Sequence, residues 1–519
     1  MYQILQLTLP PEVAFDPLAF EEYVIQKLQL QDTESYTIRK LKQSIDARSR
    51  QVKVNVQVEV FADETPTPVI HYQKNYPDVA QKPAIVIVGA GPAGLFAAIR
   101  LIELGYKPIV LERGKDVRAR RRDLAALNKD HVVNADSNYC FGEGGAGTYS
   151  DGKLYTRSNK RGDVRRMLEI MVAHGATEQI LYDAHPHIGT NKLPPLIAAM
   201  RESILSVGGE VHFETKVVDF IENFRGVTTA DGREFIGIGV ILATGHSARD
   251  IFELCQRKDV LLEAKPFAIG VRIEHPQSLI DTAQYHCEKR GGYLPAASYS
   301  LVTQTYFQNV QRGVFSFCMC PGGFIVPAAT APGEVVVNGM SPSRRDSRFA
   351  NSGLVVSIEE PDLRPFREYG ALAGVALQQH IEQKACQLTD GRQTAPAQKV
   401  LDFVQHKTSS DLLETSYQPG LMSLDLREYL PPHISEPLRM GLIDFGKKIK
   451  GYTSNKGQLI GVESRTSSPV RIPRHRDTAE HVQTPYLFPC GEGAGYAGGI
   501  MSAALDGTFV AEQVVKKYG

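Results

Sequence analysis

The sequence predicts an α/β fold in three parts: a parallel-sheet domain, an α+β domain inserted into it, and a small α+β module before both. Three observations predict this arrangement. A strand, a glycine-rich turn and a helix follow one another from residue 84, and the same order returns near residue 485. Between them, residues 261 to about 450 carry many prolines and short strand-like runs. We therefore expect domains at 1–76, 84–260 joined with 455–519, and 261–454.

Length and composition indicate an ordinary globular protein. At roughly 150 residues per domain, 519 residues suffice for about three. Lys+Arg and Asp+Glu balance at 58 each, so no overall field attracts nucleic acid or anionic lipid. Seven scattered cysteines favour a reducing compartment. The N-terminus lacks the features of a signal peptide, and the most apolar run, 84–99, is too short to span a bilayer. We expect a cytoplasmic protein with no membrane association.

The first 76 residues are expected to fold as a separate unit. Tyr2–Leu9 reads as a strand and Pro17–Leu30 as a helix with one apolar face. Valines at every second position from Val52 to Val60 indicate a half-buried strand. The polar segment 63–83 is the expected linker. A packing or dimerisation role is favoured over RNA binding for this module.

The turn after the first strand of the parallel-sheet domain has the pattern of a dinucleotide-binding site. Ile85–Val88 is followed by Gly-Ala-Gly-Pro-Ala-Gly and a helical pattern over Leu95–Leu104. Such glycines allow a tight turn, a close approach to a pyrophosphate and close helix packing, and the helix N-terminus attracts phosphate. Glu112 ends the next strand, where an acid accepts ribose hydroxyls and repels a 2′-phosphate. FAD or NAD is therefore favoured over NADP as the cofactor.

Two later segments resemble the flavin-binding motifs of two-dinucleotide-type flavoproteins. They are the strand end LATG (Leu242–Gly245) and CGEGAGYAGGIMSAALDG (Cys490–Gly507). The resemblance implies that Glu492 binds the ribityl chain and that the N–H groups at Gly498–Ile500 face the pyrimidine edge of the flavin. Three separated motifs in this order favour FAD over NAD.

Longer motifs resemble a bacterial family of uncharacterised FAD-dependent dehydrogenases, from about Lys82 onward. They are EGGAGTYSDGKL, AHPHIGT, ATGHSARD, KPFAIGVRIEHP, FCMCPGG and ESRTSSPVRI. The resemblance implies a nucleotide-binding flavoprotein with a Rossmann-like, glutathione-reductase-like FAD domain and an inserted substrate domain. It implies an oxidoreductase but no particular substrate.

The glycine-rich loop GGAGTYSDGK is a further candidate for cofactor contact, because its glycines permit close approach and Thr148, Ser150 and Lys153 can donate hydrogen bonds. The alternative is a surface loop. The complete expected FAD-binding set is Gly89, Gly91, Pro92, Ala93, Gly94, Glu112, Arg113, Gly144, Gly145, Thr148, Ser150, Lys153, Val217, Thr244, Gly245, Gly491, Glu492, Gly498, Gly499 and Ile500.

Cys318 and Cys320 suggest either core packing or thiol chemistry. In an extended strand both side chains would share one face, with the two residues roughly 6.6 Å apart. No second cysteine pair exists to complete a metal site, and no metal is expected. The only cysteine in the region where disulfide reductases of related fold carry a redox pair is Cys140. Packing is favoured for Cys318 and Cys320; the alternative is a single reactive thiol at the flavin face.

Other catalytic candidates lie near the expected domain junction. They are His246, Arg272, His275 and Arg465, of which the arginines suit an anionic small-molecule substrate or inter-domain salt bridges.

The basic run Arg113–Arg122 is expected to be a solvated helix face, with binding of RNA or of a nicotinamide 2′-phosphate as the alternatives. No second complete dinucleotide motif is visible, so NAD(P)H would act only as a transient reductant. Flavin-dependent tRNA modification and a non-catalytic FAD-binding sensor or scaffold are the alternatives to an oxidoreductase.

Overall fold

The computed structural model describes residues 2–30, 35–156 and 162–519. Its first sheet has five parallel strands in the order β22-β10-β4-β5-β6. These strands are β4 (Ala84–Val88), β5 (Lys107–Leu111), β6 (Glu210–His212), β10 (Val240–Leu242) and β22 (Leu487–Pro489). The central strands are almost wholly apolar because both faces of the sheet are covered. Strands β4 and β22, which are far apart in the sequence, therefore belong to one sheet, with β10 between them.

Helices cover one face of this sheet and a small sheet covers the other. The first face packs against α3 (Pro92–Glu103), α5 (Val164–Ala173), α6 (Leu193–Leu205) and α12 (Ile500–Tyr518). Helices α3 and α12 pack closely because Gly507 carries no side chain: a Cβ there would lie 2.0 Å from the Ala93 carbonyl oxygen. The opposite face packs against α7 (Arg249–Arg257) and the antiparallel strands β7 (Val217–Phe220), β8 (Gly226–Thr229) and β9 (Glu234–Ile236).

The second sheet has seven strands in the order β13-β14-β17-β12-β20-β18-β19. They are antiparallel except for the pair β18–β19. The strands are β12 (Phe267–Pro276), β13 (Val302–Phe307), β14 (Val310–Cys320), β17 (Phe349–Ile358), β18 (Ala395–Lys399), β19 (Leu421–Ser423) and β20 (Gln458–Glu463). The helices around it are α8 (Gln277–Tyr285), α9 (Ala373–Leu388), α10 (Val400–Val404) and α11 (Pro432–Lys448).

The connection between the two sheets departs from the expected boundary. Strand β20 pairs with β12 and β18, so residues 458–463 belong to the second sheet rather than to the FAD-binding domain that we expect from residue 455. A two-stranded ribbon of β11 (Glu263–Ala264) and β21 (Val470–Arg471) joins the sheets. Strands β15 (Phe324–Pro327) and β16 (Val337–Met340) form a separate hairpin near α4 (Val117–Lys129).

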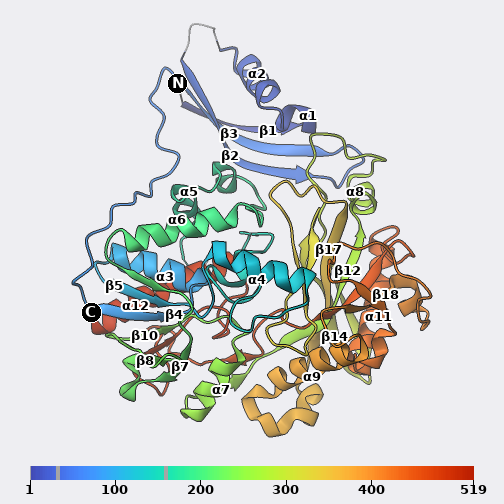
Figure 1. Cartoon of the computed structure of the whole chain (residues 1–519). Helices are drawn as coiled ribbons and strands as arrows, with labels where there is room; N and C mark the ends of the chain where they lie inside the picture. The colour runs from blue at the N-terminus through green and yellow to red at the C-terminus, as the bar shows by residue number, and fades with distance from the viewer. Residues whose placement is uncertain (1, 31–34, 157–161) are drawn as a thin grey trace.

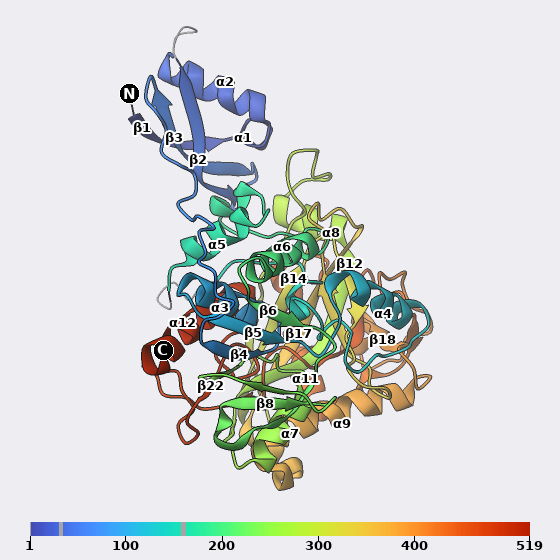
Figure 2. The same ribbon diagram turned by 60° about the vertical axis from the view of Figure 1, so that its left-hand side comes forward.

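The N-terminal residues form a three-stranded antiparallel sheet, β1-β3-β2, with two helices. Its elements are β1 (Tyr2–Leu9), α1 (Pro11–Ala14), α2 (Pro17–Leu28), β2 (Tyr36–Asp46) and β3 (Lys53–Ala62). Figures 1 and 2 show this unit projecting from the rest of the chain. Its contact with the body includes Gln43, whose backbone hydrogen-bonds Tyr182 and Ala184. No helix among the described residues is both long and apolar enough to cross a membrane.

Candidate functional site

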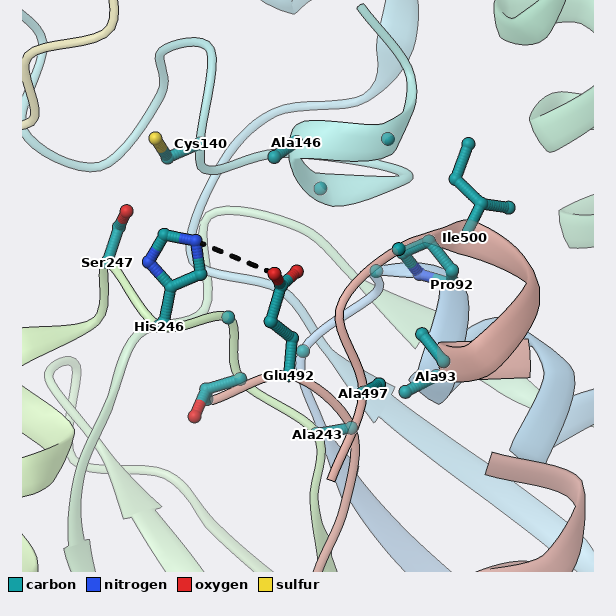
Figure 3. A pocket seen from close by; sticks show the side chains of 18 of the residues that line it. Pro92, Ala93, Cys140, Ala146, Ala243, His246, Ser247, Glu492, Ala497 and Ile500 are labelled. Atoms are coloured by element: carbon teal, nitrogen blue, oxygen red, sulfur yellow. Dashed lines mark ion pairs between the residues drawn. The ribbon is translucent and has the colours of Figure 1, made fainter. Parts of the chain in front are cut away.

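A cavity of about 980 Å³ opens at the carboxyl ends of the parallel strands. Its wall includes Gly89, Glu112 and Ala243, which directly follow β4, β5 and β10, and Glu492 in the turn after β22. Residues of the second sheet also line it. Ligands of open parallel sheets bind outside the carboxyl ends of the strands. Figure 3 shows four chain segments converging here, with Pro92, Ala146, His246 and Glu492 among the labelled side chains.

The first glycine-rich turn forms part of the cavity wall as bare backbone. Gly89 has φ +105°, and a Cβ there would lie 2.8 Å from the Ala243 carbonyl oxygen. Gly91 is the N-cap of α3, and a Cβ on it would meet no protein atom within 4 Å. Gly94 does not line the cavity: a Cβ there would lie 2.0 Å from the Gly89 carbonyl oxygen, so it serves helix packing. Pro92 and Ala93 complete the wall of this turn.

Glu112 binds the protein backbone as well as lining the cavity. Its carboxylate accepts hydrogen bonds from the backbone N–H groups of Ala90 (3.0 Å), Gly114 (2.9 Å) and Gly142 (2.9 Å). Since a carboxylate has about four acceptor positions, roughly one remains for a ligand. The binding of ribose hydroxyls by Glu112 stays a prediction, with fewer acceptor positions open than a carboxylate without backbone contacts would have. Glu112 also holds together the three loops that surround it.

A buried arginine supports the loop GGAGTYSDGK from below. Arg120 is 0% exposed and donates to the carbonyl oxygens of Asn138 (2.7 Å), Glu143 (2.9 Å) and Gly145 (2.9 Å). The basic run is thus not solely the solvated helix face that we expect, because one arginine points inward. The sequence signal that could have revealed it is the amphipathic spacing of α4, in which Val117, Arg120, Leu124 and Leu127 are buried.

The loop itself divides into cavity-lining and internal residues. Gly145, Ser150 and Lys153 line the cavity. Gly144 and Thr148 do not: the Thr148 hydroxyl is buried and donates to the Glu143 carbonyl oxygen at 2.7 Å. The expectation that Thr148 donates a hydrogen bond to the cofactor is therefore wrong for this structure. The hydroxyl of Ser150 donates to the Gly147 carbonyl oxygen, so its role in the loop is partly structural.

His246 and Glu492 face each other across the cavity, with His246 Nε2 3.8 Å from Glu492 Oε1 (Figure 3). Burial, followed by the positive charges of Arg465 and Arg249, lowers the pKa of His246 to about 4. Burial raises the pKa of Glu492 to about 7, against the opposing effect of Lys265. Near neutral pH the imidazole is uncharged and the carboxyl is close to half-protonated. This pair can hold or move a proton inside the cavity.

Most other expected cofactor residues also line this cavity. They are Arg113, Val217, Thr244, Gly245, Gly498, Gly499 and Ile500. Arg113 forms ion pairs with Asp136 (2.7 Å) and Asp250 (2.8 Å), which fix its position. Gly491 lies outside the lining, where its N–H group donates to Asp506 at 2.8 Å.

The two cysteines of FCMCPGG do not share a strand face as expected. The pairing of β14 with β17 shifts register between Phe317 and Cys320, and Cys318 has φ +43°. The two cysteines remain neighbours, with Cys320 Sγ 3.2 Å from the Cys318 carbonyl oxygen, but they differ in exposure. Cys318 lines the cavity, whereas Cys320 is 0% exposed. The packing interpretation therefore describes Cys320 but not Cys318.

Three expected catalytic residues lie outside the cavity. Arg272 is fully buried and pairs with Glu463 at 2.7 Å. Arg465 pairs with Glu334 (2.9 Å) and Glu382 (3.0 Å), and His275 bonds the Tyr452 carbonyl oxygen at 2.8 Å. Both arginines form salt bridges within the part of the chain that builds the second sheet, not between domains as expected, and neither lines the cavity.

Three further cations line the cavity at positions that we do not expect from the sequence, namely Lys216, Lys265 and Arg471. Lys265 and Arg471 are cavity residues from the ribbon that joins the sheets. Both stand within motifs already noted, KPFAIGVRIEHP and ESRTSSPVRI, but at positions that we did not single out. As for metals, the described part of the chain contains no group of three or more His, Cys, Asp or Glu residues that could hold an ion.

The residues present fit a flavin dinucleotide. A Cβ at Gly91, Gly245, Gly498 or Gly499 would meet no protein atom within 4 Å, so bare backbone lines the cavity at each point. The cavity volume of about 980 Å³ is at the upper end of the range for small-molecule and cofactor sites, which is about 300–1,000 Å³. Acidic, basic and apolar groups are all present along its wall.

Comparisons with known proteins agree with this assignment. Residues 266–466 match a family model described as "FAD-dependent protein, C-terminal domain-like", which includes β20. Residues 1–61 match a domain of unknown function, DUF8436.

Solved structures with some similarity include CtdE in complex with FAD (11% identity, 84% of this chain and 88% of that chain, TM-score 0.31). Another is the glycine oxidase of Geobacillus kaustophilus, which is 12% identical. The match covers 84% of this chain and 96% of the oxidase chain, with a TM-score of 0.31. A curated relative, an "Uncharacterized protein" of Clostridium beijerinckii, is 40% identical over 517 residues, 96% of each chain. The chain therefore belongs to the family of that Clostridium beijerinckii protein and carries, at residues 266–466, a domain of an FAD-dependent protein family.

Proposed function

We propose that this protein is an FAD-dependent oxidoreductase that acts on a small organic substrate. The observation that carries the proposal is the cavity at the carboxyl ends of the parallel strands, which the first glycine-rich turn and the C-terminal segment line together. The match of residues 266–466 to an FAD-dependent family supports FAD as the cofactor. When bound, FAD supplies the two-electron chemistry, accepting or donating a hydride or electrons.

The protein's own residues bind and orient the cofactor in this proposal. The turn from Gly89 to Ala93 offers bare backbone and the N-terminus of α3 to a pyrophosphate. Glu112 offers its remaining acceptor position to the adenosine ribose. Glu492 is proposed to bind the ribityl chain, and the N–H groups of Gly498–Ile500 to stabilise negative charge on the flavin ring.

An anionic substrate is favoured by the cavity lining. The side chains of Lys265 and Arg471 are close enough that Arg471 lowers the pKa of Lys265, after burial as the main cause. Two neighbouring cations in a cavity wall attract a carboxylate or phosphate. His246 lies in the same cavity, uncharged near neutral pH, and can accept a proton from a bound substrate.

The first test is the colour and flavin content of the purified protein. We expect yellow protein that releases FAD rather than FMN. Colourless protein that takes up no added FAD would contradict the proposed cofactor.

The second test measures anaerobic bleaching of the bound flavin with a panel of anionic metabolites, NADH and NADPH. We expect bleaching by at least one metabolite or nicotinamide cofactor. Bleaching by dithionite alone would favour a non-catalytic sensor or scaffold. Co-purification of tRNA that is released by substitution of the exposed Arg118 and Arg122 would favour RNA modification.

A further inference from the structure

The irregularity in β14 sets two thiols at different depths beside the cavity. Strand pairing with β17 is regular up to Phe317 and resumes at Cys320. Between them Cys318 adopts φ +43°, which is uncommon for a residue with a side chain. Cys318 is partly exposed in the cavity wall, and Cys320 is fully buried behind it. The arrangement gives one thiol that a cavity ligand can reach and a second that it cannot.

Two cations hold this pair. Lys153 Nζ lies 3.8 Å from Cys318 Sγ and also donates to the Met319 carbonyl oxygen. Arg272 lies 3.8 Å from Cys320 Sγ and donates to the Cys318 carbonyl oxygen at 2.9 Å. The Lys153 ammonium lies 3.7 Å from the Asp151 carboxylate, and Arg272 is neutralised in part by Glu463. Positive charge next to a thiol favours the thiolate, which is the reactive form.

The pKa values of the two thiols change in opposite directions, although Lys153 and Arg272 favour the thiolate at both. The Cys320 thiol, followed by Lys153 and Arg272, lowers the pKa of Cys318, although burial and Asp151 oppose the change. The pKa of Cys320 is raised by Cys318 and by burial. The charged and titratable groups that interact with Cys318 are Lys153, Arg272, Asp151, Cys320, Glu463 and Glu492.

We propose that Cys318 and Cys320 form a thiol redox pair in the cavity wall, in which Cys318 attacks a small disulfide and Cys320 resolves the product. The Cys318 thiolate forms a bond to one sulfur of R–S–S–R and displaces RS⁻, giving a mixed disulfide. Cys320 then loses its proton and attacks Cys318 Sγ, which displaces the second RS⁻. Both thiolates released take up protons. The protein loses two electrons and two protons, and the small disulfide becomes two thiols. This step does not depend on the proposed flavin chemistry.

The primary test exposes the purified full-length protein to oxidised glutathione and maps its cysteines by peptide mass spectrometry. In the unmodified chain we expect a Cys318–Cys320 disulfide and little glutathione adduct. In Cys320→Ser we expect glutathione to remain on Cys318, and in Cys318→Ser no adduct on the buried Cys320. A stable glutathione adduct on Cys318 of the unmodified chain, or no reaction at Cys318, would overturn the proposal of a thiol redox pair.

A measurement on the unmodified protein covers the case in which either variant fails to fold. Cys140 lines the same cavity, and its Sγ lies 3.7 Å from the Ala328 carbonyl oxygen. Iodoacetamide should alkylate Cys318 faster than Cys140 at pH 7, because the Lys153 ammonium lies 3.8 Å from Cys318 Sγ and favours its thiolate. Equal rates would contradict the reactive role of Cys318.

Two substitutions of Lys153 test whether its positive charge activates the Cys318 thiol. Lys153→Met should shift the pH at which Cys318 alkylation is half-maximal upward, because a positive charge 3.8 Å from the sulfur is lost. Lys153→Arg keeps the charge and should shift it less. An unchanged pH profile in Lys153→Met would show that the lysine does not activate the thiol.

Discussion

Glu112 and Glu492 line one cavity from opposite ends of the sequence, and their contacts predict different consequences of losing each carboxylate. Glu112 is 5% exposed and binds three backbone N–H groups, whereas the Glu492 side chain is 29% exposed in the cavity wall. Glu112 therefore has both a structural and a proposed binding role. For Glu492 the binding role dominates.

We expect Glu112→Ala and Glu492→Ala each to weaken FAD binding by about ten- to a hundredfold, since a hydrogen bond to a charged group contributes about 1.5–3 kcal/mol. Only Glu112→Ala should also lower the melting temperature of the cofactor-free protein markedly, because it leaves three N–H groups without their acceptor. FAD titration and thermal melts check both parts. Unchanged FAD affinity in both variants would mean that the cofactor is misplaced.

The ionisation of Glu492 predicts a pH dependence of the cofactor-free protein. Burial raises its pKa from an ordinary 4.5 to about 7. The folded state thus holds this proton more tightly than the unfolded state, so the contribution of Glu492 to stability is most favourable below pH 4.5 and is lost as pH rises through 7.

Glu492→Gln should remove this part of the pH dependence. Chemical denaturation of the cofactor-free unmodified protein and the variant between pH 5 and pH 8 tests it. The free energies of unfolding should diverge in favour of the variant as pH rises. Parallel profiles would indicate that Glu492 ionises normally.

At the residue scale the sequence predicted local geometry better than long-range partners. Gly89, Gly91 and Glu112 follow two successive strands and could be placed from spacing alone. The position of Cys318 could not, because it depends on how β14 pairs with β17, about 30 residues further along. The partners of Arg465 come from distant segments for the same reason.

At the scale of elements, α4 acts through Arg120, which binds three carbonyl oxygens around the loop at 143–147. We expect Arg120→Lys to destabilise the protein by about 1–3 kcal/mol, the cost of leaving a buried polar group unpaired, because one ammonium cannot reproduce the planar guanidinium contacts. Arg122→Lys is the matched control, since Arg122 is exposed on the same helix. Denaturant unfolding measures both variants. Equal stabilities would show that the loop does not need the guanidinium.

Helices and strands could be predicted best where the apolar pattern of the sequence is strong and local. The strands at Tyr2–Leu9 and Lys107–Leu111 and the first glycine-rich turn lie close to where the sequence analysis puts them. The helix expected over Pro17–Leu30 ends at Leu28, because Gln29 adopts φ +55°. Strand β2 was not predicted, since its polar residues Arg39, Lys40 and Lys42 obscure the alternation. The ten-residue strands of the second sheet were expected to be shorter, because buried polar residues such as Asn351 and Ser352 interrupt their apolar pattern.

At the scale of the whole molecule, a buried four-residue cluster joins the two main sheets. Arg249 begins α7, directly after the cavity residues His246–Ala248. It forms ion pairs with Glu334 (2.9 Å) and Glu382 (2.8 Å), and Arg465 pairs with the same two carboxylates. Glu382 lies on α9 and is 0% exposed. The cluster therefore fixes one cavity wall to the second sheet.

Glu382→Gln should destabilise the protein by about 3–5 kcal/mol at pH 7, because it removes one partner of buried arginine pairs. Burial alone would raise the pKa of Glu382, but Arg249 and Arg465 lower it to about 2. The stabilisation of the folded protein by the ionised Glu382 carboxylate is thus present above pH 4.5 and is lost as pH falls toward 2. The stability difference between the unmodified protein and the variant should shrink over that range.

Lys384→Gln removes an exposed charge on the same helix. It is the control and should change stability by less than about 0.5 kcal/mol. Denaturant unfolding from pH 7 to pH 3.5 measures all three proteins. A difference that stays constant with pH would show that packing, rather than the charge of Glu382, joins the two sheets here.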